Sequence, residues 1–397
     1  MSKIRFLIVS TSCFEEINRS VYKFLATAYN IDIHLVIPKK KLIGFKYKEC
    51  SLSTDGSYRI TAVDSRGKYL RFQRFLGLEK IVRDMNPDFV LIESDPASLL
   101  VLDIIMIVGS RHTKIWAFTN ENMERDFISE GLQALFGGRM VQGLSKFLAF
   151  AISKKTASNL SRVFVMSQDG LKAMTKMGFE GRVVKIPLGF DPAFFYPYSN
   201  EKTEEIRKGL GLQEKTIAYF GRLSPEKGID LLLKALCMIK DLKWQFLIDR
   251  FDDYNSGYGN QLLEQIRISG ISDRTVYFNA SHNQMPDYIN ASDIVVLPSV
   301  SGKKFKEQYG RVLTEAMACR KIVVGSTCGA IPEIIGGAGF VFEEGNASAL
   351  AERLRMLLTA EESHIQSFRN KAYDRARNEL SIIQQAGVLA RELSIEH

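Results

Sequence analysis

The feature that most constrains the fold is a regular alternation of short apolar runs with longer stretches of helical periodicity. In the first half, the apolar runs lie at residues 4–10, 31–37, 89–93, 114–119, 162–166 and 183–186. In the second half, they lie at residues 216–220, 243–248, 276–278, 294–297, 321–325 and 339–342. Strands that alternate with helices pair in parallel, so the sequence predicts an α/β fold.

The length of the chain predicts two domains. A single core rarely serves 397 residues. Turn-forming residues gather at 187–192 and a charged stretch follows at 200–208, which places the boundary between them. We therefore expect one domain over 1–195 and a second over 196–379. Helical periodicity at 361–393 predicts a long final helix, with residues 380–397 packing back on the first domain.

Composition excludes several classes of protein. A hydrophobic content of 46% with 25% charged residues is typical of a globular chain. No apolar run approaches the roughly 20 residues that cross a bilayer, and residues 4–10 indicate a first strand instead of a signal peptide. Five cysteines without a C-x-x-C pair favour a reduced, cytoplasmic location. The net charge of +8 favours an anionic partner, which leaves nucleotide, nucleic acid and anionic lipid open.

Three stretches of the first domain carry more specific expectations. Residues 52–66 are irregular and predict short strands, whereas 69–85 has the spacing of a helix. Residues 137–162 combine apolar positions with Arg139, Lys146 and other basic residues. Such a helix lies either on an anionic membrane or against its own sheet with its lysines reaching water, and both interpretations stay open here.

Two glutamates eight positions apart stand out in the second domain. An uninterrupted helix would rotate Glu315 about 80° away from Glu307. Gly310 between them predicts instead a loop up to Tyr309 and a helix from about Arg311, whose first N–H groups attract anions. Ionised carboxylates accept hydrogen bonds from paired hydroxyls, as in ribose and hexose.

A basic loop complements these carboxylates. Residues 221–228 (GRLSPEKG) follow a predicted strand, precede a helix and have a glycine at each end. The planar donors of Arg222 and the point charge of Lys227 suit a diphosphate, although the loop lacks the P-loop pattern. Cations and carboxylates together indicate a pocket for a nucleoside-diphosphate sugar better than they indicate a nucleic-acid groove.

In motif content and order the chain resembles the retaining nucleotide-sugar glycosyltransferases of family 4. The resemblance rests on Phe220-Gly221-Arg222-Leu223 with Lys227-Gly228, on 293–299 (DIVVLPS), on Glu307 to Glu315 and on 329–333 (GAIPE). The stretch 187–192 is similar to the P-x-G-x-D-P signature that precedes the second domain. The resemblance implies the GT-B architecture: two Rossmann-like domains that face an interdomain cleft, with the C-terminal helix crossing back to the first domain.

The same resemblance implies roles for individual residues. Arg222 and Lys227 hold the donor diphosphate and stabilise the leaving group, and Glu307 contacts the transferred sugar; these three are the catalytic candidates. Glu315 binds the ribose hydroxyls, and the other donor-binding candidates are Gly221, Tyr309, Gly310 and Arg311. The co-substrate is the nucleotide sugar, with no cofactor and no essential metal expected.

The chain departs from the family pattern at several places. The small residue common after the helix is Arg320 here, and one of two paired glycines is Ala330. The glycine-rich turn expected after residue 248 is replaced by 249–253 (DRFDD), which predicts unusual base recognition. Many members carry a histidine where this chain has Asn120-Glu121-Asn122, and the N-terminal glycine pair is replaced by 12–16 (SCFEE). Asn122, Glu121 and Glu15 are therefore the candidates on the acceptor side.

These observations predict a retaining glycosyltransferase that moves a sugar to a hydroxyl of a glycan or lipid-linked acceptor, in envelope or exopolysaccharide synthesis. Basic apolar surfaces at 39–48, 66–74 and 137–155 add peripheral association with an anionic membrane, at the inner face of the plasma membrane. Three alternatives stay open: a non-catalytic nucleotide-sugar-binding subunit, an epimerase or a phosphorylase on the same fold. Nucleic-acid binding is disfavoured because no recognition module is visible.

Overall fold

The structure is a computed structural model that describes residues 3–43, 46–67, 70–109, 112–249, 257–279 and 281–394. The chain forms two compact units. Unit 1 comprises Met1–Ile186 with Gln385–His397, and unit 2 comprises Pro187–Gln384. Of the unusual stretch at 249–253, residues 250–253 lie outside the described residues.

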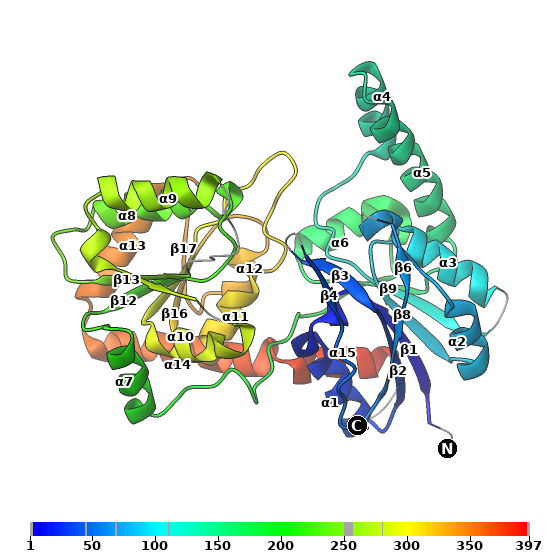
Figure 1. Ribbon diagram of the computed structural model, residues 1–397, viewed down its shortest axis with the longest axis horizontal. Helices are drawn as coiled ribbons and strands as arrows, with labels where there is room; N and C mark the ends of the chain where they lie inside the picture. The colour runs from blue at the N-terminus through cyan, green and yellow to red at the C-terminus, as the bar shows by residue number, and fades with distance from the viewer. Residues whose placement is uncertain are drawn as a thin grey trace. The chain divides into compact units, whose positions relative to one another are not determined.

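Unit 1 is built on a parallel sheet of seven strands in the order β11-β10-β9-β8-β1-β2-β5 (Figure 1). The strands are β1 (Arg5–Ser10), β2 (Asp32–Pro38), β5 (Arg59–Val63), β8 (Phe89–Glu93), β9 (Lys114–Phe118), β10 (Arg162–Val165) and β11 (Val183–Lys185). The helices are α1 (Ser20–Ala28), α2 (Leu78–Met85), α3 (Leu99–Val108), α4 (Phe127–Phe136), α5 (Met140–Ala157) and α6 (Gln168–Met174). Two small antiparallel pairs, β3 (Lys40–Ile43) with β4 (Lys46–Glu49) and β6 (Ser65–Arg66) with β7 (Arg74–Phe75), complete the unit.

Unit 2 repeats the plan with six parallel strands in the order β14-β13-β12-β15-β16-β17. The strands are β12 (Thr216–Tyr219), β13 (Gln245–Asp249), β14 (Thr275–Phe278), β15 (Ile294–Leu297), β16 (Ile322–Ser326) and β17 (Phe340–Phe342). The helices are α7 (Asn200–Gly209), α8 (Ile229–Cys237), α9 (Gly257–Ile268), α10 (Met285–Ala291), α11 (Arg311–Ala318), α12 (Ile331–Ile335), α13 (Ala347–Thr359) and α14 (Glu362–Glu379). The prediction of two parallel α/β sheets is therefore confirmed.

Each sheet has a point where the strand order reverses. In unit 1 the chain winds outward from β1 through β2 in one direction and from β8 through β9 in the other. In unit 2 the same reversal separates β12 from β15. Loops that follow the carboxyl ends of two such strands diverge and leave a crevice, which is where open α/β sheets bind ligands.

Two helix predictions need correction. The helix expected over 69–85 is confined to α2, because Arg74–Phe75 forms strand β7 and Gly77 takes a left-handed conformation (φ 80°) before the helix begins. The helix expected over 361–393 breaks between α14 and α15 (Ile382–Glu392).

The break is caused by a close crossing of two backbone segments. Ser381 bridges Phe190, and the Ile382 N–H donates to the Phe190 carbonyl at 2.9 Å. A Cβ on Gly189 would lie 2.3 Å from the Ile382 nitrogen, so glycine is required there. Beyond the break the C-terminal helix returns to unit 1, as predicted, and Glu392 accepts a hydrogen bond from Arg162 Nε at 2.5 Å.

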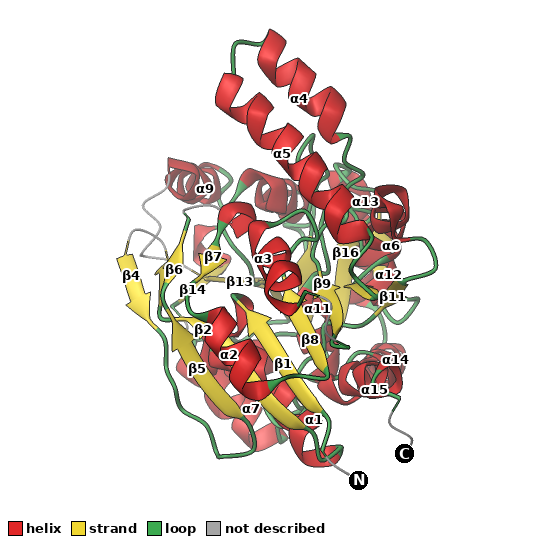
Figure 2. Ribbon diagram, turned by 90° about the vertical axis from the view of Figure 1, so that its right-hand side faces the viewer, coloured by secondary structure: helices red, strands yellow, loops and turns green. Residues whose placement is uncertain are grey.

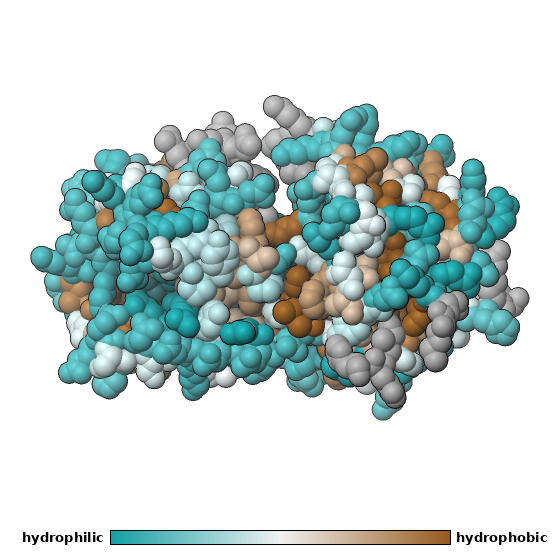
Figure 3. Space-filling view, turned by 90° about the horizontal axis from the view of Figure 1, so that it is seen from below, coloured by the Kyte–Doolittle hydropathy of each residue, from teal (hydrophilic) through white to brown (hydrophobic). Residues whose placement is uncertain are grey.

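Side chains at the surface are mixed in character. On the face shown in Figure 3, hydrophilic residues cover most of the left-hand part, and hydrophobic residues reach the surface in patches on the right-hand part. Within the described ranges, no helix combines the length and the apolar character that crossing a bilayer demands.

Candidate active site

The basic loop and the first glutamate meet at the reversal point of the unit 2 sheet. The loop 221–228 follows β12, and the stretch from Pro298 to Gly310 follows β15. The Lys227 ammonium lies 2.6 Å from Glu307 Oε2, and the Ser299 hydroxyl donates to the same oxygen at 2.7 Å. Because the Lys227 and Glu307 side chains are only 13% and 8% exposed, this ion pair is shielded from water and holds the two loops together.

Two glycines allow these loops to approach one another. Gly228 has φ 67°, and a Cβ there would lie 2.0 Å from the Pro298 carbonyl oxygen. Gly329 has φ 56°, and a Cβ there would lie 2.2 Å from the Glu307 carbonyl oxygen. That carbonyl also accepts the Ala330 N–H at 3.0 Å. The 329–333 segment thus supports Glu307 through backbone contacts that need one glycine, which explains why alanine is accommodated at position 330.

The second glutamate lies in a different environment. Helix α11 begins at Arg311 after Gly310, which has φ 80°, so the predicted loop-to-helix change at this glycine is confirmed. Glu315 lies in the second turn and is 5% exposed. Its carboxylate has no hydrogen bond or ion pair with any residue in the described part of the chain. Burial raises the pKa of Glu315 to about 7, partly offset by the positive charge of Arg311.

The remaining donor-side candidates divide into exposed and buried groups. Arg222 is exposed, and its guanidinium forms no ion pair with the described residues. Its backbone carbonyl accepts the Tyr219 hydroxyl at 2.8 Å, and a Cβ on Gly221 would lie 2.8 Å from the same hydroxyl. Tyr309 is 3% exposed, and burial raises the pKa of its phenol. Among the described residues Arg222 is therefore an exposed cation without an ion pair, whereas Lys227 is paired with Glu307.

The acceptor-side candidates lie in unit 1 and are not equivalent. Glu15 is exposed between two short 3-10 turns. Asn122 is 6% exposed and follows β9. The Glu121 carboxylate accepts from Arg125 Nε at 3.2 Å and lies 3.6 Å from Arg71, so it is neutralised by two arginines.

Sequence reasoning missed a carboxylate at the reversal point of unit 1. Glu93 ends β8 and accepts hydrogen bonds from the hydroxyls of Ser10, Ser12 and Tyr22. Because Ser10 and Tyr22 are fully buried, the network is fixed within the unit. A carboxylate at the end of an otherwise apolar strand was the available signal.

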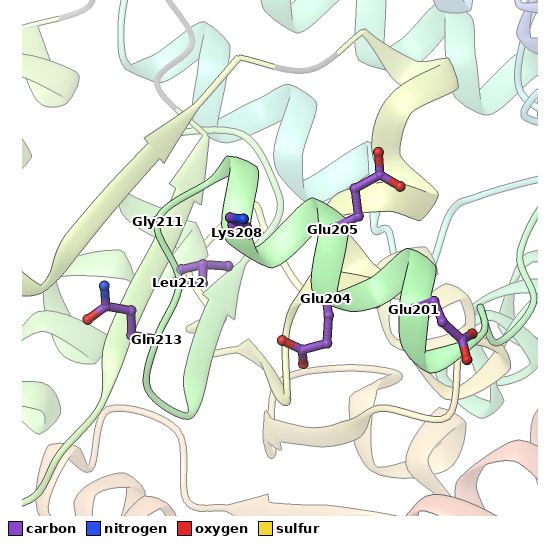
Figure 4. Close-up of a pocket in the computed structure, with 7 residues that line it drawn as sticks. All are labelled: Glu201, Glu204, Glu205, Lys208, Gly211, Leu212 and Gln213. Carbon is purple, nitrogen blue, oxygen red and sulfur yellow. The ribbon is translucent and has the colours of Figure 1, made fainter.

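Two other features bear on ligand binding. A pocket in unit 2 is lined by Glu201, Glu204, Glu205, Lys208, Gly211, Leu212 and Gln213. Of these, Gly211, Leu212 and Gln213 lie in the segment that enters β12 at its amino end, whereas the loop 221–228 follows the carboxyl end of that strand. The glutamate side chains of the pocket point in different directions (Figure 4). In the described residues no three His, Cys, Asp or Glu side chains gather as ligands for a metal ion.

Comparison with known proteins agrees with this geometry. Residues 201–378 match the family described as Glycosyl transferases group 1. The N,N'-diacetylbacillosaminyl-diphospho-undecaprenol alpha-1,3-N-acetylgalactosaminyltransferase of Campylobacter jejuni is 23% identical over 81% of this chain and 81% of its own length. A D-inositol 3-phosphate glycosyltransferase of Corynebacterium jeikeium is 31% identical, over 45% of this chain and 44% of its own length, so less than half of that relative is spanned.

A solved structure extends the likeness to the whole fold. Anabaena HepE in complex with UDP superposes with a TM-score of 0.73 at 19% identity, covering 99% of this chain and 100% of that one. The two Rossmann-like sheets and the returning C-terminal helix are those of the GT-B architecture. Motif order, loop geometry and these similarities lead to one conclusion: the chain is a retaining glycosyltransferase whose residues 201–378 match the glycosyl transferases group 1 family.

Proposed function

We propose that this glycosyltransferase moves a sugar from a nucleoside diphosphate to a hydroxyl of a glycan or lipid-linked acceptor, with retention of configuration, in envelope or exopolysaccharide synthesis. Unit 2 binds the donor and unit 1 the acceptor. The observation that carries the proposal is the buried Lys227–Glu307 ion pair at the β12/β15 reversal point. It supports the proposal because the cation proposed to hold phosphate is in direct contact with the carboxylate proposed to hold the sugar.

The donor diphosphate binds at the loop 221–228. Arg222 is free to receive it, and the phosphate oxygens compete with Glu307 for the Lys227 ammonium. Once Lys227 turns to the diphosphate, Glu307 Oε2 keeps its bond from Ser299 and becomes available to a sugar hydroxyl. Binding therefore exchanges one ion pair for another, which limits the desolvation cost of placing the diphosphate there.

The ribose of the donor is held by Glu315. A buried carboxylate without a partner is costly, and two vicinal hydroxyls would supply the hydrogen bonds that it lacks. Donor binding also favours the ionised form, so it lowers the pKa of Glu315 from its raised value of about 7.

In the transfer step, the acceptor hydroxyl oxygen bonds to the anomeric carbon on the face that the leaving group departs from. The bond from that carbon to the diphosphate oxygen breaks, and the hydroxyl proton leaves with the nucleoside diphosphate. Arg222 and Lys227 stabilise the charge that develops on the leaving diphosphate, which is the main contribution of the protein. No side-chain nucleophile is required.

The name of the Campylobacter jejuni relative, which contains diphospho-undecaprenol, supports a lipid-linked acceptor. Such an acceptor would be met at a membrane, in keeping with the peripheral association predicted from the basic apolar surfaces. Cytoplasmic location at the inner face of the plasma membrane is proposed on the same grounds.

The test is sugar transfer measured with UDP-, GDP- and ADP-sugars across a panel of glycan and lipid-linked acceptors. Arg222→Ala is expected to lower kcat/KM at least about a hundredfold, as when a charge-stabilising group is removed. Glu315→Ala is expected to lower kcat/KM by weakening donor binding, because the ribose hydroxyls lose their acceptor. Arg353→Ala and Glu352→Ala, exposed residues of α13, are the matched controls and should leave it unchanged. Transfer that survives both site substitutions would refute the site. Donor binding without transfer would indicate a binding subunit, and isomerised sugar alone an epimerase.

A further inference from the structure

Helices α4 and α5 form an antiparallel hairpin that projects from the rest of unit 1, as Figures 1 and 2 show from two directions. The turn between them contains Gly137 and Gly138, the latter with φ 71°. Asp126 caps α4 by accepting the Ser129 N–H at 3.1 Å. The projection is therefore built from two regular helices with a defined cap and turn.

Small residues bring the two helices close together. A Cβ on Gly131 of α4 would lie 3.1 Å from the ring of Phe147, and one on Gly143 of α5 would lie 2.6 Å from Leu135. These two glycines mark the line along which the helices touch. On one side of that line the Glu130 carboxylate pairs with the Lys146 ammonium.

The opposite side of the hairpin is apolar and exposed. At about 100° per residue, positions 128, 132 and 136 of α4 lie 60° to 140° around the helix from Gly131. Positions 140, 144 and 148 of α5 lie at the same angles from Gly143, and in antiparallel neighbours equal angles point to the same face. The exposed fractions on this face are Ile128 42%, Leu132 43%, Phe136 90%, Met140 66%, Leu144 61% and Leu148 45%. Val141, at about 160° from Gly143, borders this face and is 82% exposed.

The charge of the hairpin restricts what can cover this face. Residues 127–157 contain four basic side chains, Arg139, Lys146, Lys154 and Lys155, and one acidic side chain, Glu130. Arg139 stands at the tip and the two adjacent lysines at the base. A second copy of the chain would bring like charges together across a self-complementary interface. An anionic lipid surface offers both an apolar layer and opposite charge.

We propose that the α4–α5 hairpin is a membrane-docking element that inserts its apolar face into the headgroup and acyl boundary of an anionic lipid surface. This inference rests on the proposed function in that it names where a lipid-linked acceptor is met. One of the two interpretations left open for residues 137–162 was a single helix on an anionic membrane, and the proposal gives a two-helix element in its place. Hydrophobic insertion supplies the binding energy and the basic residues supply the preference for anionic lipid.

The experiment is co-sedimentation of the full chain with vesicles of phosphatidylcholine, alone or mixed with phosphatidylglycerol. The triple variant Leu132→Ser, Phe136→Ser, Val141→Ser should raise the vesicle dissociation constant at least about tenfold, since each buried side chain contributes strongly to such binding. The control variant Met238→Ser, Ile268→Ser changes exposed apolar residues of unit 2 and should bind as the unsubstituted chain does. Binding by the triple variant at unchanged affinity would overturn the proposal.

Charge is tested separately with Lys154→Gln, Lys155→Gln. Each lysine near an anionic surface changes affinity by about fivefold, so this variant should lose most of its preference for phosphatidylglycerol and keep part of its binding. Equal binding of the unsubstituted chain to both vesicle types, or no binding to either, would overturn the proposal. So would a dimer in light scattering that the triple variant dissolves, because it would identify a second copy as the occupant.

Two further measurements keep the outcomes apart. Circular dichroism and thermal unfolding check that the triple variant is folded, and Phe136→Ser alone, at the most exposed position, replaces it if it is not. Donor affinity and transfer to a water-soluble acceptor are measured without vesicles. Donor affinity and transfer should be the same in the triple variant and the unsubstituted chain. Loss of vesicle binding with intact transfer then tests docking alone. Vesicle binding without transfer would count against the proposed function and not against docking.

Discussion

Glu315→Gln is expected to change how the stability of unit 2 depends on pH. Glu315 is buried and has no hydrogen-bond or ion-pair partner among the described residues, and burial raises the pKa of its carboxyl from 4.5 to about 7. Glutamine keeps the size and shape of the side chain and removes the charge. The substitution therefore separates the cost of the buried charge from the packing of the side chain.

The raised pKa of Glu315 in the folded chain decides whether the unfolding free energy rises or falls with pH. Below pH 4.5 the carboxyl is protonated in the folded and the unfolded chain, and the charge costs nothing. As pH rises from 4.5 to about 7, the unfolded chain ionises first, so the unfolding free energy falls, and above pH 7 it stays level. The interval from 4.5 to about 7, at about 1.4 kcal/mol for each pH unit, gives a total fall of about 3.5 kcal/mol.

The glutamine variant lacks this fall. Both side chains bury a polar group of the same shape, so the two proteins should differ by less than about 1 kcal/mol at pH 5, where only the first part of the fall has occurred. At pH 8 the variant should be more stable by about 3.5 kcal/mol. The prediction is tested by the difference in unfolding free energy between the two proteins at each pH, because every other titrating group contributes equally to both.

Urea unfolding between pH 5 and pH 8 measures this difference. The chain has two tryptophans, and Trp116→Phe leaves Trp244, 1% exposed in unit 2, as the fluorescent reporter. Glu352→Gln, on the exposed side of α13, is the control and should give no pH-dependent difference. A difference between Glu315→Gln and its parent that stays flat from pH 5 to pH 8 would refute the argument.

Two further substitutions test the loop contacts. Lys227→Met leaves Glu307 as a buried charge without its cation and should lower the unfolding free energy by about 3 kcal/mol. The double variant Lys227→Met, Glu307→Gln should recover a large part of this loss. Equal stability of the single and the double variant would contradict this argument. Gly228→Ala places a Cβ 2.0 Å from the Pro298 carbonyl oxygen in a residue with φ 67°. It should lower the unfolding free energy measured in urea by at least about 2 kcal/mol. The control Gly209→Ala, whose Cβ would have no atom within 4 Å, should lower it by less than about 1 kcal/mol.

The strands were predictable because parallel sheets bury both faces. Strand β15, for example, is apolar and buried at every position, and such runs are visible in sequence. One of the two incorrect helix predictions shows the limit of local sequence pattern. The periodicity at 361–393 continues through Ser381, and only contact with Phe190, nearly two hundred positions away, breaks the helix there. Local pattern contains no information on such a contact.

Part of the candidate site was also predictable. Gly310 between two glutamates indicated the change from loop to helix, because glycine tolerates the left-handed conformation that begins α11. The Lys227–Glu307 contact joins residues 80 positions apart and depends on the strand order, which the sequence does not show. The sequence also did not show that Glu307 is paired whereas Glu315 has no partner among the described residues, because both positions are occupied by glutamate.

The two reversal points differ in a way that bears on which unit binds the donor. In unit 1, the Glu93 carboxylate is satisfied by the hydroxyls of Ser10, Ser12 and Tyr22. In unit 2, Glu307 is held by a cation that a phosphate can compete for, and Glu315 has no partner among the described residues. A carboxylate whose hydrogen bonds are filled by its own chain gains little from a sugar diol, whereas one left empty gains most. The energetics therefore favour polyol recognition in unit 2, and they assign Glu93 to the support of the unit 1 loops.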